Sequence, residues 1–258
     1  MHIVAAGQTD VGLRREHNED AYLIDPHLGL YIVCDGVGGH AAGEVASHKT
    51  VSIVQEVIHR HRALLDAYLT SPSDTQLNAV TQLVEEAVQE ACSCLYTIGE
   101  HDPSKKGMGT TIVMLLALQQ TVIVAHAGDS RVYLIRDHHL HQLTEDHSLA
   151  RELMKAGVLD REQLKTWPLA NVITRCVGSQ PTVQVDTRVV ACHVGDRFLL
   201  CSDGFHNYLH DDDEDDALLE MSTRLTPAQL VTACVTFAND HGGQDNITVL
   251  VTEVAALA

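Results

Sequence analysis

Positive charge is scarce in this sequence. Its 258 residues contain 17 Lys and Arg against 35 Asp and Glu, which gives a formal net charge of −18 at pH 7. A surface this acidic repels nucleic acid and anionic lipid, so we expect neither as a partner. A neutral or basic protein partner is compatible with the charge.

Long apolar runs are also missing. No stretch approaches the roughly 20 apolar residues that a membrane-spanning helix needs. The first residues, Met1-His2-Ile3-Val4, lack the charged and apolar regions of a signal peptide. We therefore expect a cytoplasmic protein without a membrane segment.

Cysteine pairs are absent too. The seven cysteines are an odd number, none forms a Cys-x-x-Cys motif, and most lie inside apolar runs. This pattern favours buried free thiols in a reducing compartment over disulfides. The cysteines are Cys34, Cys92, Cys94, Cys176, Cys192, Cys201 and Cys234.

Short apolar runs bounded by turn residues indicate many strands, and 3.6-residue periodicity indicates two long helices and three shorter ones. The expected strands are Ile3–Thr9, Ala21–Ile24, Leu30–Cys34, Thr110–Leu118, Thr121–Ala127, Val132–Arg136, Val183–Val190, Arg197–Ser202 and Ile247–Val251. The expected helices are Gly43–Leu69, Thr75–Ile98, Leu149–Ala156, Asp213–Met221 and Pro227–Asn239. Helices clustered between runs of antiparallel strands predict a layered α+β fold.

Five acidic clusters each lie at one end of a short apolar run. They are Asn18-Glu19-Asp20, Asp35-Gly36-Val37-Gly38-Gly39-His40, Gly128-Asp129-Ser130-Arg131, Ser202-Asp203-Gly204 and Asp245-Asn246. Carboxylates gathered at sheet edges form the all-oxygen sites that Mg²⁺ and Mn²⁺ prefer. No His or Cys follows zinc-site spacing near them. A single Asp-Gly is better explained as a turn, but five such clusters favour a metal site.

Other residues that could take part in catalysis give weaker evidence for a function. Arg15 offers a planar fork of donors for phosphate, and Arg14 competes for that role. His40 lies beside the Asp35 loop and is either a general acid or a residue that orders the loop. The run Asp211–Asp216 is interpreted as a solvated helix start, since it lacks the spacing of a calcium loop. No Gly-x-Ser-x-Gly nucleophile motif is present.

Together these clusters resemble the metal-dependent serine/threonine phosphatases of the PP2C (PPM) family, especially its compact bacterial branch. The resemblance spans the chain from Thr9 to Thr248. Its further pieces, in family order, are Gly43-Glu44, Gly109-Thr110-Thr111, Asp146-His147-Ser148 and Asn171-Val172-Ile173-Thr174-Arg175. Each piece alone is weak, but the ordered set is specific.

The resemblance implies a single domain over residues 1–258 with a four-layer α/β/β/α sandwich, in which two antiparallel sheets are flanked by helix pairs. It implies a flap at about residues 146–178. It also implies two Mn²⁺ or Mg²⁺ ions, with a possible third, in a cleft between the sheets.

The resemblance also implies a role for each site residue. Asp35 would bridge two metals, and the Gly36 carbonyl would bind one of them. Asp203 and Asp245 would hold the other, Glu19 and Asp20 would contribute directly or through water, and Asp129 with Asp203 would match a third site. Arg15 matches the phosphate-binding arginine. These implied metal ligands and catalytic residues are Arg15, Glu19, Asp20, Asp35, Gly36, Asp129, Asp203 and Asp245.

The implied reaction is hydrolysis of phosphoserine or phosphothreonine by a metal-activated water. Many family members carry a His after the Asp-Gly pair as proposed general acid, whereas this chain has Val37. The proton must then come from elsewhere, such as a water or His40. The expected substrates are phosphoproteins, in opposition to a Ser/Thr kinase, and a monomer is expected by default.

Two other functions fit the same fold less well. A catalytically silent module that binds a kinase or phosphoprotein conflicts with the intact acidic set. A metal-binding protein without catalysis leaves Arg15 and the flap-like segment unexplained.

Overall fold

The structure is a computed structural model that describes residues 1–38, 41–160, 163, 167, 169, 172–209 and 216–257. Its strands are β1 (His2–Asp10), β2 (Ala21–Asp25), β3 (Leu30–Cys34), β4 (Gly36–Val37), β5 (Gly109–Thr110), β6 (Ile112–Ala117), β7 (Thr121–Ala127), β8 (Arg131–Arg136), β9 (His139–Gln142), β10 (Asp186–Ala191), β11 (Arg197–Cys201) and β12 (Ile247–Ala256). Its helices are α1 (Ala41–Arg60), α2 (Arg62–Thr70), α3 (Asp74–His101), the short 3₁₀ helix η1 (Pro103–Lys105), α4 (Leu149–Lys155), α6 (Asp203–His206), α7 (Asp216–Arg224) and α8 (Pro227–Asp240).

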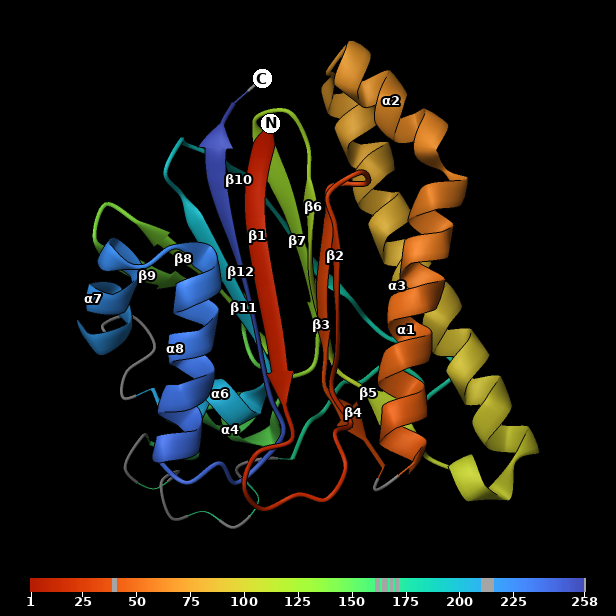
Figure 1. Cartoon of the computed structure of the whole chain (residues 1–258). Coiled ribbons are helices and arrows are strands. Elements are labelled where there is room, and N and C mark those ends of the chain that lie inside the picture. The colour runs from red at the N-terminus through yellow and green to blue at the C-terminus, as the bar shows by residue number, and fades with distance from the viewer. Residues whose placement is uncertain are drawn as a thin grey trace.

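Two five-stranded antiparallel sheets form the centre of the fold, in the orders β1-β12-β11-β8-β9 and β10-β7-β6-β3-β2. Helices α1, α2 and α3 cover the outer face of the second sheet, and α7 and α8 cover that of the first (Figure 1). The expected four-layer α+β sandwich is therefore confirmed.

Alternating side chains of the central strands supply three separate hydrophobic layers. In β3, Leu30, Ile32 and Cys34 pack toward the helices α1 and α3. The intervening Tyr31 and Val33 pack between the two sheets. Because successive residues of a strand face opposite ways, burial on both faces requires an uninterrupted apolar run. This is why the central strands were conspicuous in the sequence.

Several element boundaries differ from the sequence expectations. The first long helix is divided at His61, whose φ of −101° and ψ of 21° are not helical. The expected strand from Thr110 is interrupted at Thr111, whose backbone N–H donates to the carbonyl of Asp35 (2.8 Å). Here the chain leaves β5, which pairs with β4, and enters β6, which pairs with β3.

The C-terminal half departs from expectation in four places. The hairpin between β8 and β9 places His139 in β9, after a turn at Asp137 and His138 with φ of 52° and 63°. Strand β10 begins at Asp186, because Val183 and Val185 pack against the helix-side core instead. The segment after β11 forms the short helix α6, and β12 continues to Ala256.

The two chain termini lie at one end of the sheets, and α4, α6, β4 and β5 lie at the opposite end (Figure 1). Asp35 follows β3, Asp203 follows β11, and Asp245 precedes β12, so these three acidic residues meet at that opposite end. None of the described helices is long and apolar enough to cross a membrane. All seven cysteines are free thiols, as expected.

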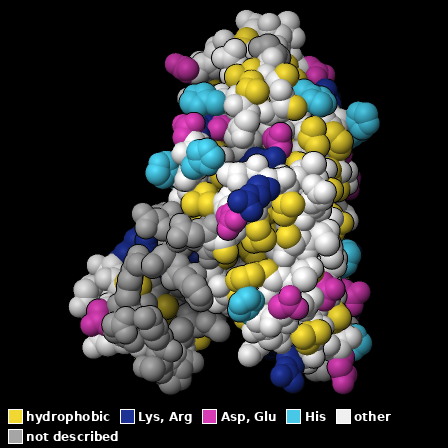
Figure 2. Space-filling model, turned by 60° about the vertical axis from the view of Figure 1, so that its left-hand side comes forward, with side chains coloured by type: hydrophobic (Ala, Val, Ile, Leu, Met, Phe, Trp, Pro, Cys, Tyr) yellow, Lys and Arg dark blue, Asp and Glu magenta, His cyan; other side chains and the backbone are white. Residues whose placement is uncertain are grey.

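Surface charge is dispersed on the face shown in Figure 2. Acidic and histidine side chains are scattered there among uncharged ones, and the coloured Lys and Arg side chains do not gather into a broad basic patch.

Candidate active site

A cavity of about 250 Å³ opens at this end of the sheets, and we call it the acidic cavity. Its walls bring together residues far apart in the sequence, such as Arg15 and Asp245, which are separated by 230 positions. The lining residues are Arg15, Glu19, Asp35, Gly36, Val37, Gly38, Thr111, Asp129, Ile173, Asp203, Asp245 and Asn246. Of the eight residues predicted for the site, seven line this cavity, and Asp20 does not.

Asp35 is held by its backbone at the end of β3. Its N–H donates to the hydroxyl of Thr111 (3.0 Å), and its carbonyl accepts from the Thr110 hydroxyl (2.8 Å). The next residue must be glycine, since a Cβ on Gly36 would lie 2.4 Å from the carbonyl oxygen of Gly43 and 2.5 Å from that of Glu19. These contacts fix the Asp35 carboxylate without using its oxygens.

Glu19 and Asp245 are tied together by Asn246. The Asn246 amide oxygen accepts from the backbone N–H of Glu19 (2.8 Å), and its amide nitrogen donates to the carbonyls of Val11 and His17 (3.0 and 2.9 Å). The loop between β1 and β2 is thereby attached to the start of β12. This explains the Asp-Asn pair in chemical terms, because the amide both donates and accepts.

Asp20 is almost fully buried, at 3% exposure. Its Oδ2 accepts from the Ser202 hydroxyl (2.8 Å), whereas its Oδ1 has no hydrogen-bond partner. Burial and the charges of Asp203 and Asp245 raise the pKa of Asp20 to about 7. A buried carboxylate oxygen without a donor has a strong electrostatic preference for a cation or a proton.

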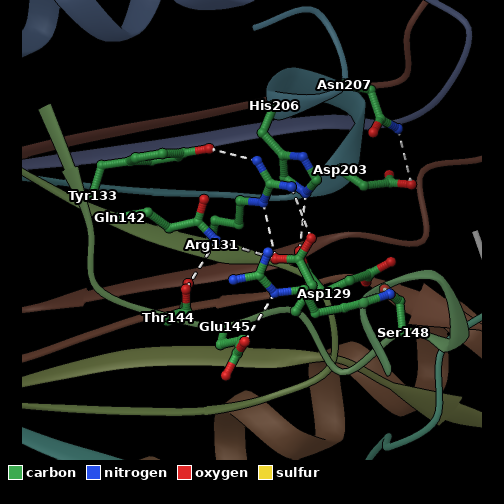
Figure 3. Close-up of polar contacts among 12 residues, drawn as sticks. Asp129, Arg131, Tyr133, Gln142, Thr144, Glu145, Ser148, Asp203, His206 and Asn207 are labelled. Carbon is green, nitrogen blue, oxygen red and sulfur yellow. Dashed lines mark hydrogen bonds and ion pairs between the residues drawn. The ribbon is translucent and has the colours of Figure 1, made fainter. Parts of the chain in front are cut away.

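Asp203 begins α6, and Asp129 lies in the loop between β7 and β8 (Figure 3). The carboxylate of Asp203 accepts from the side chain of Asn207, one turn later (3.3 Å). Burial and Asp203 raise the pKa of Asp129 to about 7. Burial and Asp245 also raise the pKa of Asp203.

The electrostatics of the acidic cavity fit a divalent cation. Burial, together with Asp20 and Asp203, raises the pKa of Asp35 well above its ordinary range. Carboxylates crowded in this way repel one another when ionised, and a bound cation removes that repulsion. The donors are all oxygens, which suits Mn²⁺ and Mg²⁺.

Arg15 lies at the rim of the acidic cavity with its side chain 52% exposed. Its guanidinium donates to Asp245 Oδ2 (2.7 Å). Arg14 is exposed and does not line the cavity, so the geometry favours Arg15 for contact with an anion there. Val37 lines the cavity where a histidine was considered, and His40 lies outside the described residues.

Arg131 connects two of the sequence motifs, Gly128-Asp129-Ser130-Arg131 and Asp146-His147-Ser148, through an ion pair. Its guanidinium donates to both carboxylate oxygens of Asp146 (2.9 and 2.7 Å) and to the hydroxyl of Tyr133 (3.0 Å). This bidentate pair joins the start of β8 to the segment before α4. Neither Arg131 nor Asp146 lines the acidic cavity.

A second group of possible metal ligands comprises His126, His147 and Asp186, whose donor atoms lie within 4.8 Å of one another. The protein's own hydrogen bonds already account for it. His147 Nδ1 accepts from the Gly128 N–H (3.2 Å), and its Nε2 lies 3.3 Å from Asp186 Oδ2 and 3.1 Å from Arg175 Nη1. Arg175 Nη1 bonds Asp186 at 2.8 Å. We interpret this group as a brace, not a metal site.

The segment expected to form a flap contains α4 and approaches the acidic cavity through Ile173. One isolated bridge, between Thr110 and Val177, attaches it to β5, and another, between Ser148 and Ile173, joins two parts of the segment to each other. The backbone N–H of Thr174 also donates to the carbonyl of His147 (2.7 Å). Asn171 and seven residues between 161 and 170 lie outside the described part of the chain.

Sequence reasoning did not single out His126 or His206 as parts of the site region, and it named His147 only within the Asp146-His147-Ser148 motif. All three are buried, at 6%, 7% and 5% exposure. His126 stands within the apolar strand β7, Thr121–Ala127, and His206 directly follows Phe205, and this was the available signal. Their partners are backbone carbonyls, which no residue pattern displays.

Known proteins resemble this chain over nearly its whole length. The family model described as Protein phosphatase 2C matches residues 13–237. The serine/threonine phosphatase stp of Listeria monocytogenes serotype 4b is 36% identical over 256 residues, which cover 98% of this chain and 96% of that protein.

Solved structures give the same result. The serine/threonine phosphatase of S. agalactiae has a TM-score of 0.85 and 32% identity, covering 98% of this chain and 100% of that one. The catalytic domain of the phosphatase PstP, solved in complex with two manganese ions, has a TM-score of 0.80 and 29% identity, covering 98% and 99%.

The raised pKa values of the acidic cavity predict a pH effect on metal-free protein. Folded Asp129, with a pKa of about 7 against an ordinary 3.8, keeps a proton that the unfolded chain has lost. The unfolding free energy should therefore fall as pH rises between about 4 and 7. Thermal unfolding in EDTA measures this, and Asp129→Asn should flatten the decline.

Two comparisons make that measurement specific. His147 and His206 have lowered pKa values, about 4 and about 3, and they contribute the opposite trend, so the difference between wild type and variant is the relevant quantity. Saturating Mn²⁺ should abolish the difference. An identical pH slope in EDTA for both proteins would contradict the assigned electrostatics.

Proposed function

Since the chain belongs to the protein phosphatase 2C family and is a metal-dependent serine/threonine protein phosphatase, we propose that the acidic cavity is its catalytic centre and holds two divalent cations. The observation that carries this proposal is the convergence of Glu19, Asp35, Asp129, Asp203 and Asp245 on one cavity with Arg15 at its rim. The manganese complex of PstP supports Mn²⁺ as one suitable ion. Mg²⁺ suits the same oxygen donors.

We assign the ligands as follows. Asp35 and the Gly36 carbonyl would hold the cations, together with Asp203 and Asp245. Glu19 and the buried Asp20 contribute directly or through water, and the unpartnered Oδ1 of Asp20 supports such a contact.

A third cation site is part of the proposal. We assign it to Asp129 together with Asp203. Both carboxylates line the acidic cavity, and the charge of Asp203 raises the pKa of Asp129. A cation shared by the two would remove that repulsion.

The bound cations would supply a water of lowered pKa as nucleophile and positive charge for the phosphoryl oxygens. The protein's part is positional. The hydrogen bonds of Thr110 and Thr111 hold the backbone of Asp35, so its carboxylate does not need to reorganise during the reaction. Arg15 binds the phosphoryl group, for which its 52% exposed side chain is accessible.

The described residues that line the cavity offer few side chains that could donate a proton to the leaving group. That lining contains no His, Cys or Lys, and Val37 is apolar. The Thr111 hydroxyl is already bonded to Ser130 (2.7 Å) and to the Asp35 N–H. We therefore propose that water donates this proton.

The substrates are phosphoproteins. We further propose that the enzyme opposes a Ser/Thr kinase, acts as a monomer in the cytoplasm, and forms one domain over residues 1–258 with a flap at about 146–178. The seven free thiols support a reducing compartment. A catalytically silent module is the alternative, and the complete set of carboxylates argues against it.

Mn²⁺-dependent hydrolysis of p-nitrophenyl phosphate and of a phosphothreonine peptide should be lost in Asp35→Asn. Removing a direct metal ligand should lower the activity by more than the roughly 10–100-fold that follows from removing a residue that only hydrogen-bonds a ligand. The matched control is Asp66→Asn, an exposed carboxylate on α2 that pairs with Arg62. Mn²⁺-dependent turnover retained in Asp35→Asn, or none in wild type, would contradict the proposal.

Arg15→Ala should raise KM for the phosphothreonine peptide by about tenfold or more, because a charge-assisted hydrogen bond contributes about 1.5–3 kcal/mol. Steady-state kinetics at saturating Mn²⁺ measures this, and Mn²⁺ titration shows whether loss of the Asp245 contact matters. Arg14→Ala is the control and should leave KM unchanged. An unchanged KM in Arg15→Ala would exclude the phosphate role.

A further inference from the structure

His206 connects the two sides of the acidic cavity. It is the last residue of α6, the helix that begins with Asp203, and it is 5% exposed. Its Nε2 lies 2.9 Å from the carbonyl oxygen of Asp129. The contact therefore runs from the helix that carries one cavity carboxylate to the loop that carries another (Figure 3).

The hydrogen-bond partners fix the tautomer of His206. A carbonyl oxygen only accepts, so Nε2 carries the hydrogen and donates it to Asp129. The other ring nitrogen, Nδ1, is buried without a hydrogen-bond partner. Burial and the nearby Arg131 guanidinium also lower the pKa of His206 to about 3, so the ring is neutral. It acts as a fixed donor, not as a charge.

The loop that receives this hydrogen bond has a backbone that needs support. Gly128 has a φ of +117°, and a Cβ there would lie 2.6 Å from the Thr111 side chain. The carbonyl of Gly128 accepts from the His147 N–H (2.9 Å), which holds one side of the loop. His206 holds the carbonyl group of the next residue, Asp129. The carboxylate of this residue lines the cavity.

We propose that His206 is a positioning residue that sets the distance between the Asp129 and Asp203 carboxylates, and thereby the affinity of the cation site that they share. The inference rests on the proposed function, because it concerns the cation site assigned there to these two residues. Removing the ring hydrogen bond lets the Asp129 loop move relative to α6. The cation shared by Asp129 and Asp203 should then bind less tightly.

The experiment compares His206→Leu, which cannot donate, with His206→Gln, whose side-chain amide can still donate to the carbonyl. Mn²⁺ binding is followed by isothermal titration and by the electron paramagnetic resonance signal of free Mn²⁺. In His206→Leu one Mn²⁺ site, the one that Asp129 and Asp203 share, should lose about 10–100-fold in affinity, as is usual for residues that orient ligands. His206→Gln should recover most of it.

The matched control is His126, another buried histidine whose Nε2 contacts a backbone carbonyl at 2.9 Å, that of Glu145. It lies outside the lining of the acidic cavity. His126→Leu should lower Tm in EDTA, as His206→Leu does, and leave Mn²⁺ affinity unchanged. If His206→Leu does not fold, His206→Asn takes its place, because its shorter side-chain amide does not reach the Asp129 carbonyl.

The possible outcomes distinguish failure of the positioning role of His206 from failure of the proposed function. Unchanged Mn²⁺ affinity in His206→Leu, or an equal loss in His126→Leu, overturns the positioning role and leaves the proposed function intact. Failure of His206→Gln to exceed His206→Leu in affinity also overturns it. Wild-type protein that binds no Mn²⁺ would instead overturn the proposed function.

Discussion

Electrostatic repulsion among buried carboxylates is the constraint on which the site depends. Asp20, Asp35, Asp129 and Asp203 all have raised pKa values, and in each case burial is the largest cause, with at least one neighbouring carboxylate contributing. A protein does not gather such groups for stability, since each one favours the protonated or unfolded state near neutral pH. Their arrangement is explained by a positively charged ligand, and by the chemistry that a divalent cation provides.

The rest of the fold holds these groups together against that repulsion. The backbone of Asp35 is bonded to Thr110 and Thr111, and Asn246 joins the Glu19 loop to the start of β12. These contacts use backbone atoms or neutral side chains, and none of them involves a carboxylate oxygen of Asp35 or Glu19. The sheets also bring the acidic residues together. Asp35, Asp203 and Asp245 adjoin β3, β11 and β12 at the same end of the two sheets.

The acidic residues could be located from the sequence because they follow or precede apolar runs with a clear period. Strands buried on both faces, such as β3, appear as continuous apolar segments, and their ends mark the Asp residues. What joins those ends was not predictable. The partners of His206 and His126 are backbone carbonyls, and the Arg131–Asp146 pair closes only when β8 and the segment before α4 are in place. Such contacts depend on tertiary geometry, which residue types alone do not encode.

Diffraction from crystals grown with Mn²⁺, recorded for anomalous scattering, tests the central claim most directly. The account requires Mn²⁺ peaks inside the acidic cavity, within bonding distance of Asp35 and of Asp203 or Asp245, and their loss in Asp35→Asn crystals. It also requires no peak at His126, His147 and Asp186, where Arg175 already neutralises the carboxylate. Peaks at that histidine group and none in the acidic cavity would contradict it.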